Sequence, residues 1–446
     1  MKPVNSRRIV ESALGLFVVS LTVRAIFLWL VAQNFTSDEY WFKFSDTVFF
    51  ADVAQSFRDG FALHEESLAL VGPGYGFVLF IQDLFAGSNV WANLIINILV
   101  SSLNCLLVRS LALRVGVSKT TAALAGYICA LSISSISFSC ILYSETVFTL
   151  ITLLTVHSFL STVAQGRLSD GLAFASLCAI ASLIRSVGQF YPLMLALLLA
   201  LWIWHERNNA GLPDIPLRSA RLFMYVTLAA ALTIIWPLRN YAVHGVFTIS
   251  ETGTRAARDY WIAEAVADIH GDTSLEIPRV LWKKQIASRY GPTGPTILQR
   301  HEFDLNIIRD TVSAYPLETF SAYLGNVWTN MTSESYVQHE NVPQLDELWT
   351  FYSKRFASNL GVVLVMLHFL GSYLMIRGGL WRAATLLALF YLYLALITGA
   401  SFWQGSRLFL PAQPFWAISC AFALFWILEK SKGLLRHLRS RWLPAD

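Results

Sequence analysis

The sequence contains little charge for its length. Asp, Glu, Lys and Arg make up only 14% of its 446 residues, whereas soluble domains carry about 25%. Hydrophobic residues make up 55%, and they recur in long runs with few or no charged side chains. This composition excludes an ordinary soluble enzyme and predicts an all-α polytopic membrane protein. The net charge is only +4, so nothing indicates nucleic-acid binding.

Patterns that bind metals or form disulfides are also missing. No CxxC or HExxH spacing occurs, so no metal site or cofactor is evident, and dependence on a divalent metal stays open. The five cysteines fall within or at the edge of apolar segments, which implies no disulfide framework. They are Cys105, Cys129, Cys140, Cys178 and Cys420.

Hydropathy predicts about ten spanning helices, each near the ~20 residues needed to cross the hydrocarbon core. Two long segments, 33–90 and 241–355, are not membrane-spanning. The predicted spans cover residues 11–32, 91–113, 120–139, 141–164, 171–187, 189–205, 221–240, 356–376, 381–400 and 408–429.

The basic residues sort by side of the membrane. Lys and Arg gather at the N-terminus, in alternate short loops and in the C-terminal tail. With ten spans all of these lie on one face, which the positive-inside rule makes cytoplasmic. Both termini are then cytoplasmic, and both long segments lie on the outer face, which is the periplasm if the membrane is a bacterial inner membrane. We expect an N-terminal transmembrane module (1–240) with a first outer loop (33–90), a loop domain (241–355), and C-terminal helices with a basic tail (356–446).

The outer segments contain their own helical patterns. Residues 45–60 form an amphipathic stretch typical of a helix in the membrane interface, with Ser45 as N-cap and Gly60 as its stop. A short apolar stretch, 76–85, follows a Gly-Pro-Gly-Tyr turn and is too short to span. In the second segment we expect helices over 278–290, over 296–314, and from Pro316 to about Asn330.

Carboxylates on the outer face are the first candidates for chemistry. Asp46 opens the amphipathic stretch, where it suits a general base that takes a proton from an acceptor hydroxyl. A first-turn Asp that only favours the helix dipole is the alternative. Asp38 and Glu39 are competing carboxylates just upstream, or a solvated pair at the membrane exit.

Ionisable residues near the outer ends of the spans are the second group. Glu145 and Arg185 lie at the same depth, so they form either a structural ion pair or the wall of a polar pocket. Arg239, Arg255 and Arg407 lie on the outer face, where arginine suits phosphate binding or anchors in lipid headgroups. Mid-span Arg24 is interpreted as a packing or snorkelling residue.

Taken in order, these pieces resemble the GT-C superfamily of polyprenol-phosphate-sugar-dependent glycosyltransferases, with most likeness to its protein-mannosyltransferase and aminoarabinose-transferase branch. The resemblance covers residues 10 to 430 approximately. The residues that carry it are Asp46, Phe50, Ala54 and Gly60, then Pro73-Gly74-Tyr75, Ser144-Glu145, Arg185, Trp236-Pro237 with Arg239-Asn240, and Arg407-Leu408 with Pro411 and Pro414. The sequence departs from the family at Phe50, where many relatives have Tyr, and at Val71-Gly72, where some have a basic residue.

The resemblance implies an inverting glycosyltransferase that takes a sugar from a polyprenyl phosphate and passes it to a lipid, glycan or protein acceptor on the outer face. Asp46 would be the base, and Arg239, Arg255 or Arg407 would bind the departing phosphate. Tyr75, Glu145 and Arg185 would shape the pocket. Two other classes stay open: a lipid or glycolipid transporter or flippase, and a non-catalytic relative that binds glycolipid.

Overall fold

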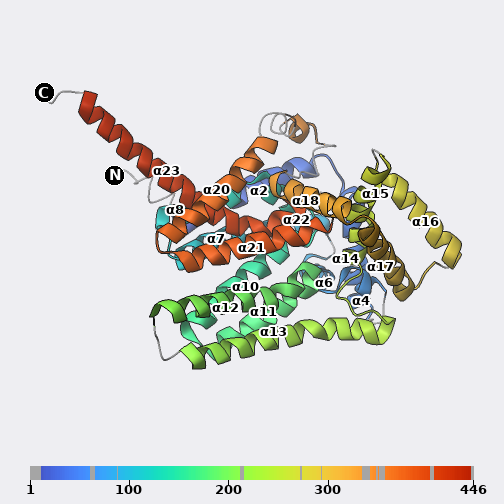
Figure 1. The fold of residues 1–446 in the computed structure, drawn as a ribbon. Coiled ribbons are helices and arrows are strands. Elements are labelled where there is room, and N and C mark those ends of the chain that lie inside the picture. The colour runs from blue at the N-terminus through green and yellow to red at the C-terminus, as the bar shows by residue number, and fades with distance from the viewer. Residues whose placement is uncertain are drawn as a thin grey trace.

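The computed structural model describes residues 12–60, 66–87, 89–210, 215–271, 274–292, 294–333, 342–347, 350, 357–401 and 406–442. Within these ranges every regular element is a helix, so the predicted all-α fold is confirmed (Figure 1). Eight of the described helical stretches are long and apolar enough to cross a membrane, and the chain is an integral multi-pass membrane protein. They are α2 (Ala13–Ala32), α7 (Val90–Arg114), α10 (Glu145–Gln165), η1 (Ser186–Phe190) with α12 (Tyr191–Ala210), α13 (Ile215–His244), α20 (Ala357–Arg377), α21 (Trp381–Gly399), and α22 (Ser406–Phe409) with η4 (Leu410–Ala412) and α23 (Gln413–Trp442).

Two predicted spans differ from this set. The predicted span 120–139 is a bent pair, α8 (Lys119–Leu131) and α9 (Ile133–Ser139), with 56° between them. The predicted span 171–187 is α11 (Leu168–Ile184), whose 17 residues extend only ~25 Å against a hydrocarbon core of ~30 Å. The count is therefore eight, or nine with the bent pair, rather than about ten. Because α11 packs between α10 and α13, it still belongs to the bundle.

The bend between α8 and α9 is stabilised by a buried arginine. Ser132 has an extended backbone at the break, and its side chain caps the start of α9. Arg24 of α2 donates hydrogen bonds to Ala130 O (3.0 Å) and Ser135 Oγ (2.7 Å), one on each side of the break, and also to Ser101 Oγ (2.8 Å). Arg24 is fully buried, so of the two predicted roles it packs inside the bundle and does not snorkel. It replaces part of the backbone bonding that the broken helix loses.

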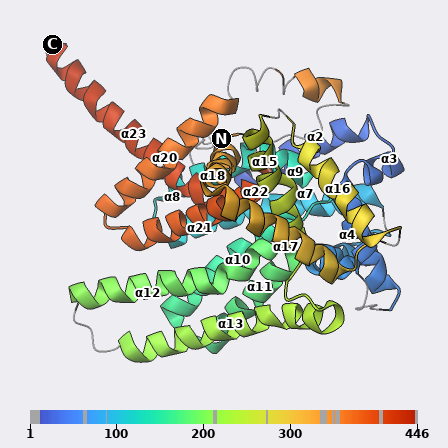
Figure 2. The same ribbon diagram turned by 45° about the vertical axis from the view of Figure 1, so that its right-hand side comes forward.

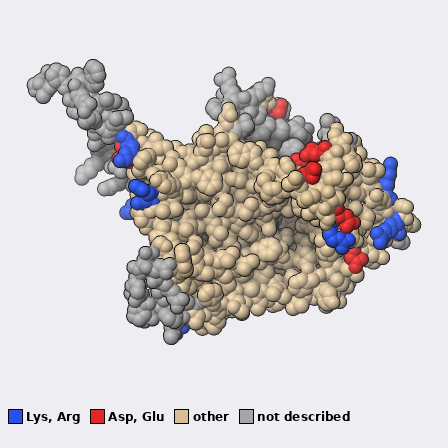
Figure 3. All heavy atoms as spheres, in the orientation of Figure 1, with Lys and Arg blue, Asp and Glu red and all other residues tan. Residues whose placement is uncertain are grey.

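The two long non-spanning segments meet at one end of the bundle. Figure 1 and Figure 2 show α4 (Ser45–Arg58), α16 (Glu276–Tyr290) and α17 (Ile297–Ala314) at the same end of the molecule, far from the C-terminus. Two hydrogen bonds join the segments, from Glu251 N to Ala69 O (2.9 Å) and from Thr252 Oγ1 to Leu70 O (2.6 Å). On the face in Figure 3, Lys, Arg, Asp and Glu gather at the ends, and the broad middle is free of them. Which end faces the cytoplasm stays a prediction.

The helices predicted in these segments are confirmed within a few residues. α16, α17 and α18 (Pro316–Thr332) cover the three expected in the second segment. In the first segment, α4 ends before Gly60, which has a φ of 92°. The prediction that Ser45 is the N-cap was wrong, because Ser45 is the first helical residue of α4. The cap position belongs to Phe44, which has an extended backbone, and no side-chain hydrogen bond caps the helix.

The Gly-Pro-Gly-Tyr turn brings α6 (Gly74–Ala86) against the end of α11. A Cβ atom at Gly74 would lie 2.5 Å from both Leu183 C and Ile184 N, closer than side chains tolerate. Only glycine therefore allows the start of α6 to approach the α11 backbone this closely. This contact fixes Tyr75, the next residue of α6, relative to Arg185, the residue that follows α11.

Replacing Gly74 by alanine should destabilise the protein by ~1–3 kcal/mol, because the added methyl group meets backbone that cannot rotate away. Gly325→Ala is the matched control, since Gly325 lies within α18 with open space around its Cα. There alanine should be neutral or stabilise by up to ~1 kcal/mol. Thermal unfolding in detergent measures both, and equal midpoints for the two variants would contradict the packing argument.

Candidate active site

Arg407 connects two carboxylates that are far apart in the sequence. It lies in α22, and its guanidinium contacts the carboxylate of Asp46, in the first turn of α4. Its Nε also donates to Glu145 Oε1 over 2.9 Å. The Arg407 side chain is 13% exposed and that of Asp46 is 37% exposed. Asp46 is thus the accessible member of the group, and its Oδ1 has no hydrogen-bond partner among the described residues.

Glu145 is the buried centre of the group. It is the first residue of α10, and it is fully buried. Arg185, in the extended link between α11 and η1, contacts Glu145 Oε1 over 2.8 Å and donates to Ser144 Oγ over 2.9 Å. The predicted pairing of Glu145 with Arg185 is confirmed. Two arginines and two carboxylates balance in charge, which makes their burial tolerable.

Aromatic residues surround this charged group. The Arg407 guanidinium lies over the Tyr143 ring, 4.2 Å from its centroid, which is a cation–π contact. Tyr75 is buried and packs edge-on against Phe50 of α4, with 4.8 Å between ring centroids. Burial raises the pKa of Tyr75 well above its usual value, and the charge of Glu145 raises it further. Tyr143 was not predicted as a site residue, although it directly precedes Ser144-Glu145.

The other predicted site residues lie outside this group. Arg255 is 47% exposed and pairs with Asp259 over 3.7 Å. Arg239 donates to Asn240 Oδ1 over 2.6 Å. Neither contacts Asp46, Glu145 or Arg185 among the described residues, so the structure does not bring all three predicted arginines together.

The alternative carboxylates belong to α3 (Ser37–Phe42). Glu39 Oε2 accepts hydrogen bonds from Thr36 N and Thr36 Oγ1, both over 2.8 Å, and completes a capping box. These bonds lower the pKa of Glu39. Asp38 lies exposed in the same first turn. Of the three predicted carboxylates, Asp46 is the one in contact with an arginine of the buried group.

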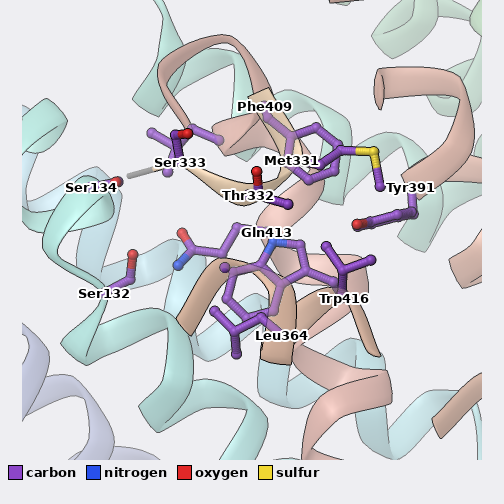
Figure 4. A pocket seen from close by; sticks show the side chains of 13 residues that line it. Ser132, Ser134, Met331, Thr332, Ser333, Leu364, Tyr391, Phe409, Gln413 and Trp416 are labelled. Atoms are coloured by element: carbon purple, nitrogen blue, oxygen red, sulfur yellow. The ribbon is translucent and has the colours of Figure 1, made fainter. Parts of the chain in front are cut away.

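A small cavity adjoins the Arg407 segment (Figure 4). It has a volume of about 30 Å³, room for one or two water molecules. Phe409, two residues after Arg407, lines it together with Leu364 and Trp416, and Ser134 and Gln413 add polar atoms. A larger ligand would have to displace these side chains. Among the residues that the structure describes, no three His, Cys, Asp or Glu side chains gather as metal ligands.

Removing the charge of Glu145 should cost ~3–5 kcal/mol of stability, because Glu145→Gln leaves two buried arginines without their shared carboxylate. Asp310→Asn is the control: Asp310 pairs with Arg309 but is 70% exposed, so its loss should cost ~0–1 kcal/mol. Unfolding midpoints in detergent compare the two variants. A Glu145→Gln midpoint no lower than that of the control would contradict a central role for this carboxylate.

A second charged cluster lies within the second outer segment, beside its junction with the first outer segment. Arg258 contacts Asp304 of α17, and His301 Nδ1 lies 2.8 Å from Glu251 Oε1. Burial raises the pKa of Asp304 to about 6. Hydrogen bonding to Glu251 raises the pKa of His301, although burial opposes the rise. Glu251 is the residue whose N–H bonds Ala69, so this cluster stabilises the junction.

The stability of this junction should fall as pH rises from about 5 to 8. Both folded pKa values are raised, so the folded state binds more protons than the unfolded state at His301 and Asp304. The His301 contribution is complete below its unfolded pKa of ~6.5 and is lost as pH rises through the folded value. Hydrogen exchange of residues 252–256 should therefore be slower at pH 6 than at pH 8 after correction for the intrinsic rate. His301→Gln should reduce this difference, and His270→Gln, at an exposed position, should preserve it.

Fold and site together define a multi-pass membrane protein with a buried charged group at one end of its helical bundle. No family model and no curated protein matches the chain. Among solved structures, the crystal structure of the Archaeoglobus fulgidus oligosaccharyltransferase in the apo form is similar, with a TM-score of 0.50, 12% identity, and coverage of 97% of this chain and 52% of that chain. A structure of the same organism's oligosaccharyltransferase AglB with an inhibitory peptide and dolichol-phosphate covers the same shares at 12% identity and a TM-score of 0.46.

The likeness is one of fold. The chain spans about half the length of the solved structures it matches, and its helical bundle resembles that of the archaeal oligosaccharyltransferase. At this identity, the donor, the acceptor and the residues that act on them are matters for proposal.

Proposed function

We propose that the protein is an inverting membrane glycosyltransferase that moves a sugar from a polyprenyl-phosphate donor to an acceptor hydroxyl on the outer face of the membrane. The observation that carries the proposal is the contact between Asp46 and Arg407. It puts a carboxylate suited to accept a proton beside an arginine suited to bind phosphate, on a bundle whose fold resembles that of a GT-C transferase.

In the proposed reaction, the acceptor oxygen attacks the anomeric carbon of the sugar. The bond between that carbon and the donor phosphate oxygen breaks, and the polyprenyl phosphate leaves with the electron pair. Asp46 takes the hydroxyl proton through Oδ1, the oxygen that no described residue bonds. Arg407 stabilises the charge that develops on the phosphate. One displacement inverts the anomeric configuration.

In this proposal, Arg407 gives up one carboxylate contact when the donor phosphate binds. Glu145 is fully buried and also holds Arg185, so it is the fixed partner. Asp46 is the more exposed partner and is the one that yields. The exchange would free both oxygens of Asp46 for the acceptor hydroxyl at the moment when the donor is in place.

The remaining residues have supporting roles in this proposal. Tyr75 and Arg185 shape the pocket around Glu145, while Arg239 and Arg255 lie away from the reacting atoms. The donor tail would lie between helices in the outer leaflet, and the acceptor would be a lipid, a glycan or a protein. We place both termini in the cytoplasm and the site in the periplasm of a bacterial inner membrane.

The stereochemistry of the product tests the single-displacement proposal. Purified protein, a polyprenyl-phosphate sugar and an acceptor should yield a product of inverted anomeric configuration together with free polyprenyl phosphate, both visible by NMR. A product of retained configuration would contradict it, because retention requires a second nucleophile.

A transporter is the second candidate, and the bent pair α8–α9 favours it, since broken helices are common at transporter binding sites. At this break, however, the bonding groups of Arg24 are already used by the protein. Proteoliposomes that contain the wild type or Asp46→Asn test this candidate. If both proteins move fluorescent polyprenyl phosphate between the leaflets at the same rate, the result would favour transport.

A further inference from the structure

The end of α13 contains buried nitrogen atoms that form no hydrogen bond with any residue the structure describes. Arg239 is half-buried, and its Nε and Nη2 are buried without hydrogen-bond partners. Trp236 Nε1 and His244 Nε2 are also buried without a hydrogen-bond partner among the described residues. Such groups cost ~1–3 kcal/mol each when left unpaired, so four of them within nine residues point to a bound ligand.

The geometry of Arg239 indicates what this ligand is. Its Nη1 donates to Asn240 Oδ1, and Asn240 is held in turn by Nδ2 bonds to Thr248 O and Ile249 O. The side that remains, Nε with Nη2, is the edge of the guanidinium that binds phosphate or carboxylate with two parallel bonds. Asn240 therefore orients Arg239 and leaves its bidentate edge without a partner among the described residues.

Two neighbouring donors lie near the Arg239 side chain. The guanidinium lies over the Trp236 ring, 5.0 Å from its centroid. His244 lies within electrostatic reach of Arg239. Arg239 makes no ion pair with any described residue, whereas Arg185 and Arg407 share Glu145. A half-buried cation without a paired carboxylate favours an external anion.

The position of these donors indicates a lipid. Trp236 to His244 form the last turns of a candidate span, near the depth of headgroups. Trp236 packs against Val53 and Phe57 of α4, so the donors lie in the seam between α13 and the first outer segment. Leu238 and Tyr241 are exposed beside them, on the apolar outer surface of the helix.

We propose that Trp236, Arg239 and His244 bind the phosphate group of a membrane lipid at a site separate from the Asp46–Arg407 centre. Arg239 holds two phosphate oxygens through Nε and Nη2, and Trp236 Nε1 donates a third bond. His244 donates through Nε2 in the tautomer that carries its proton there. The lipid is either the polyprenyl phosphate or a bulk anionic phospholipid. The proposal does not require transfer activity, because a non-catalytic relative would keep the site.

Counting bound lipids by native mass spectrometry tests the proposal. The full chain is purified in a phosphate-free detergent and offered a short polyprenyl monophosphate, phosphatidylglycerol or inorganic phosphate. If Arg407 also binds phosphate, the wild type should bind two lipid molecules and Arg239→Gln one. If Arg407 does not, the counts should be one and none. Both outcomes support the Arg239 site, because Arg239→Gln loses one bound lipid in each. Counts of one and none would also contradict the proposed function, since Arg407 would then bind no phosphate.

Affinity measurements sharpen the test and identify the lipid. Arg239→Gln should weaken lipid binding at its site by ~10-fold or more. Trp236→Phe, which keeps an aromatic ring but lacks the Nε1–H donor, should weaken it by less. Arg289→Gln, on the exposed side of α16, should bind as the wild type does. If polyprenyl monophosphate binds more tightly than phosphatidylglycerol, the ligand of the Arg239 site is the donor lipid. If the two bind equally, the ligand is a bulk phospholipid. A folded Arg239→Gln with wild-type counts and affinities, or inorganic phosphate that binds as tightly as the lipids, would overturn the proposal.

Discussion

Replacing Asp46 by asparagine should lower the rate of sugar transfer by ~10²–10⁴-fold, the contribution typical of a general base. The amide has nearly the same shape as the carboxylate but cannot take the proton of the acceptor hydroxyl. Because the Asp46 side chain is 37% exposed, the variant should fold and insert normally. Transfer of radiolabelled sugar measures the rate, and gel filtration in detergent checks the fold.

Two other aspartates serve as controls for this variant. Asp52 is exposed on the same helix, α4, and Asp38 is exposed on α3. Asp52→Asn should transfer sugar at the wild-type rate, and so should Asp38→Asn if Asp46 is the base. Full activity in Asp46→Asn would contradict the assignment and would turn attention to Asp38 and Glu39.

Replacing Arg407 by glutamine should lower kcat by ~10²–10³-fold, since a preorganised charge next to the leaving group contributes at this scale. Arg407→Lys should recover only part of the loss, because an ammonium keeps the charge but lacks the planar fork that holds phosphate. Added guanidinium should rescue Arg407→Gln more than Arg407→Lys. A merely structural role for Arg407 would show no such rescue.

The stability of the Arg407 variants needs its own measurement. Without Arg407, buried Glu145 keeps only Arg185, so Arg407→Gln should also unfold at a lower temperature. Arg255→Gln is the matched control, because Arg255 is half-exposed and, among the described residues, forms an ion pair with Asp259 alone. It should preserve both kcat and the unfolding temperature. An unchanged kcat in folded Arg407→Gln would contradict its proposed role at the phosphate.

The charged group shows how far a single sequence predicts a site. Glu145 and Arg185 were paired correctly because both are ionisable residues at the same end of consecutive apolar helices. The contact of Arg407 with Asp46 joins residues 361 positions apart, and hydropathy gives depth in the membrane but not the angle around the bundle. The sequence therefore predicts that three arginines lie on one face of the membrane. Which of them contacts the carboxylates, Arg407 rather than Arg239 or Arg255, depends on tertiary packing.

The broken span shows a second limit. Residues 120–139 have the hydropathy of one helix, because a bend does not change composition. The residues that stabilise the bend, Arg24, Ser101 and Ser135, come from three separate helical elements. In the sequence, Arg24 is one charge within an apolar run, a pattern that also fits snorkelling. Burial and hydrogen-bond partners distinguish the two, and both arise only from tertiary packing.

The most direct test of the account is whether purified protein consumes a lipid-linked sugar. A panel of radiolabelled polyprenyl-monophosphate sugars is incubated with the wild type, Asp46→Asn and Asp52→Asn, and the released polyprenyl phosphate is measured. The account predicts that the wild type and Asp52→Asn consume at least one member of the panel and that Asp46→Asn does not. Consumption at equal rates by all three proteins would contradict it.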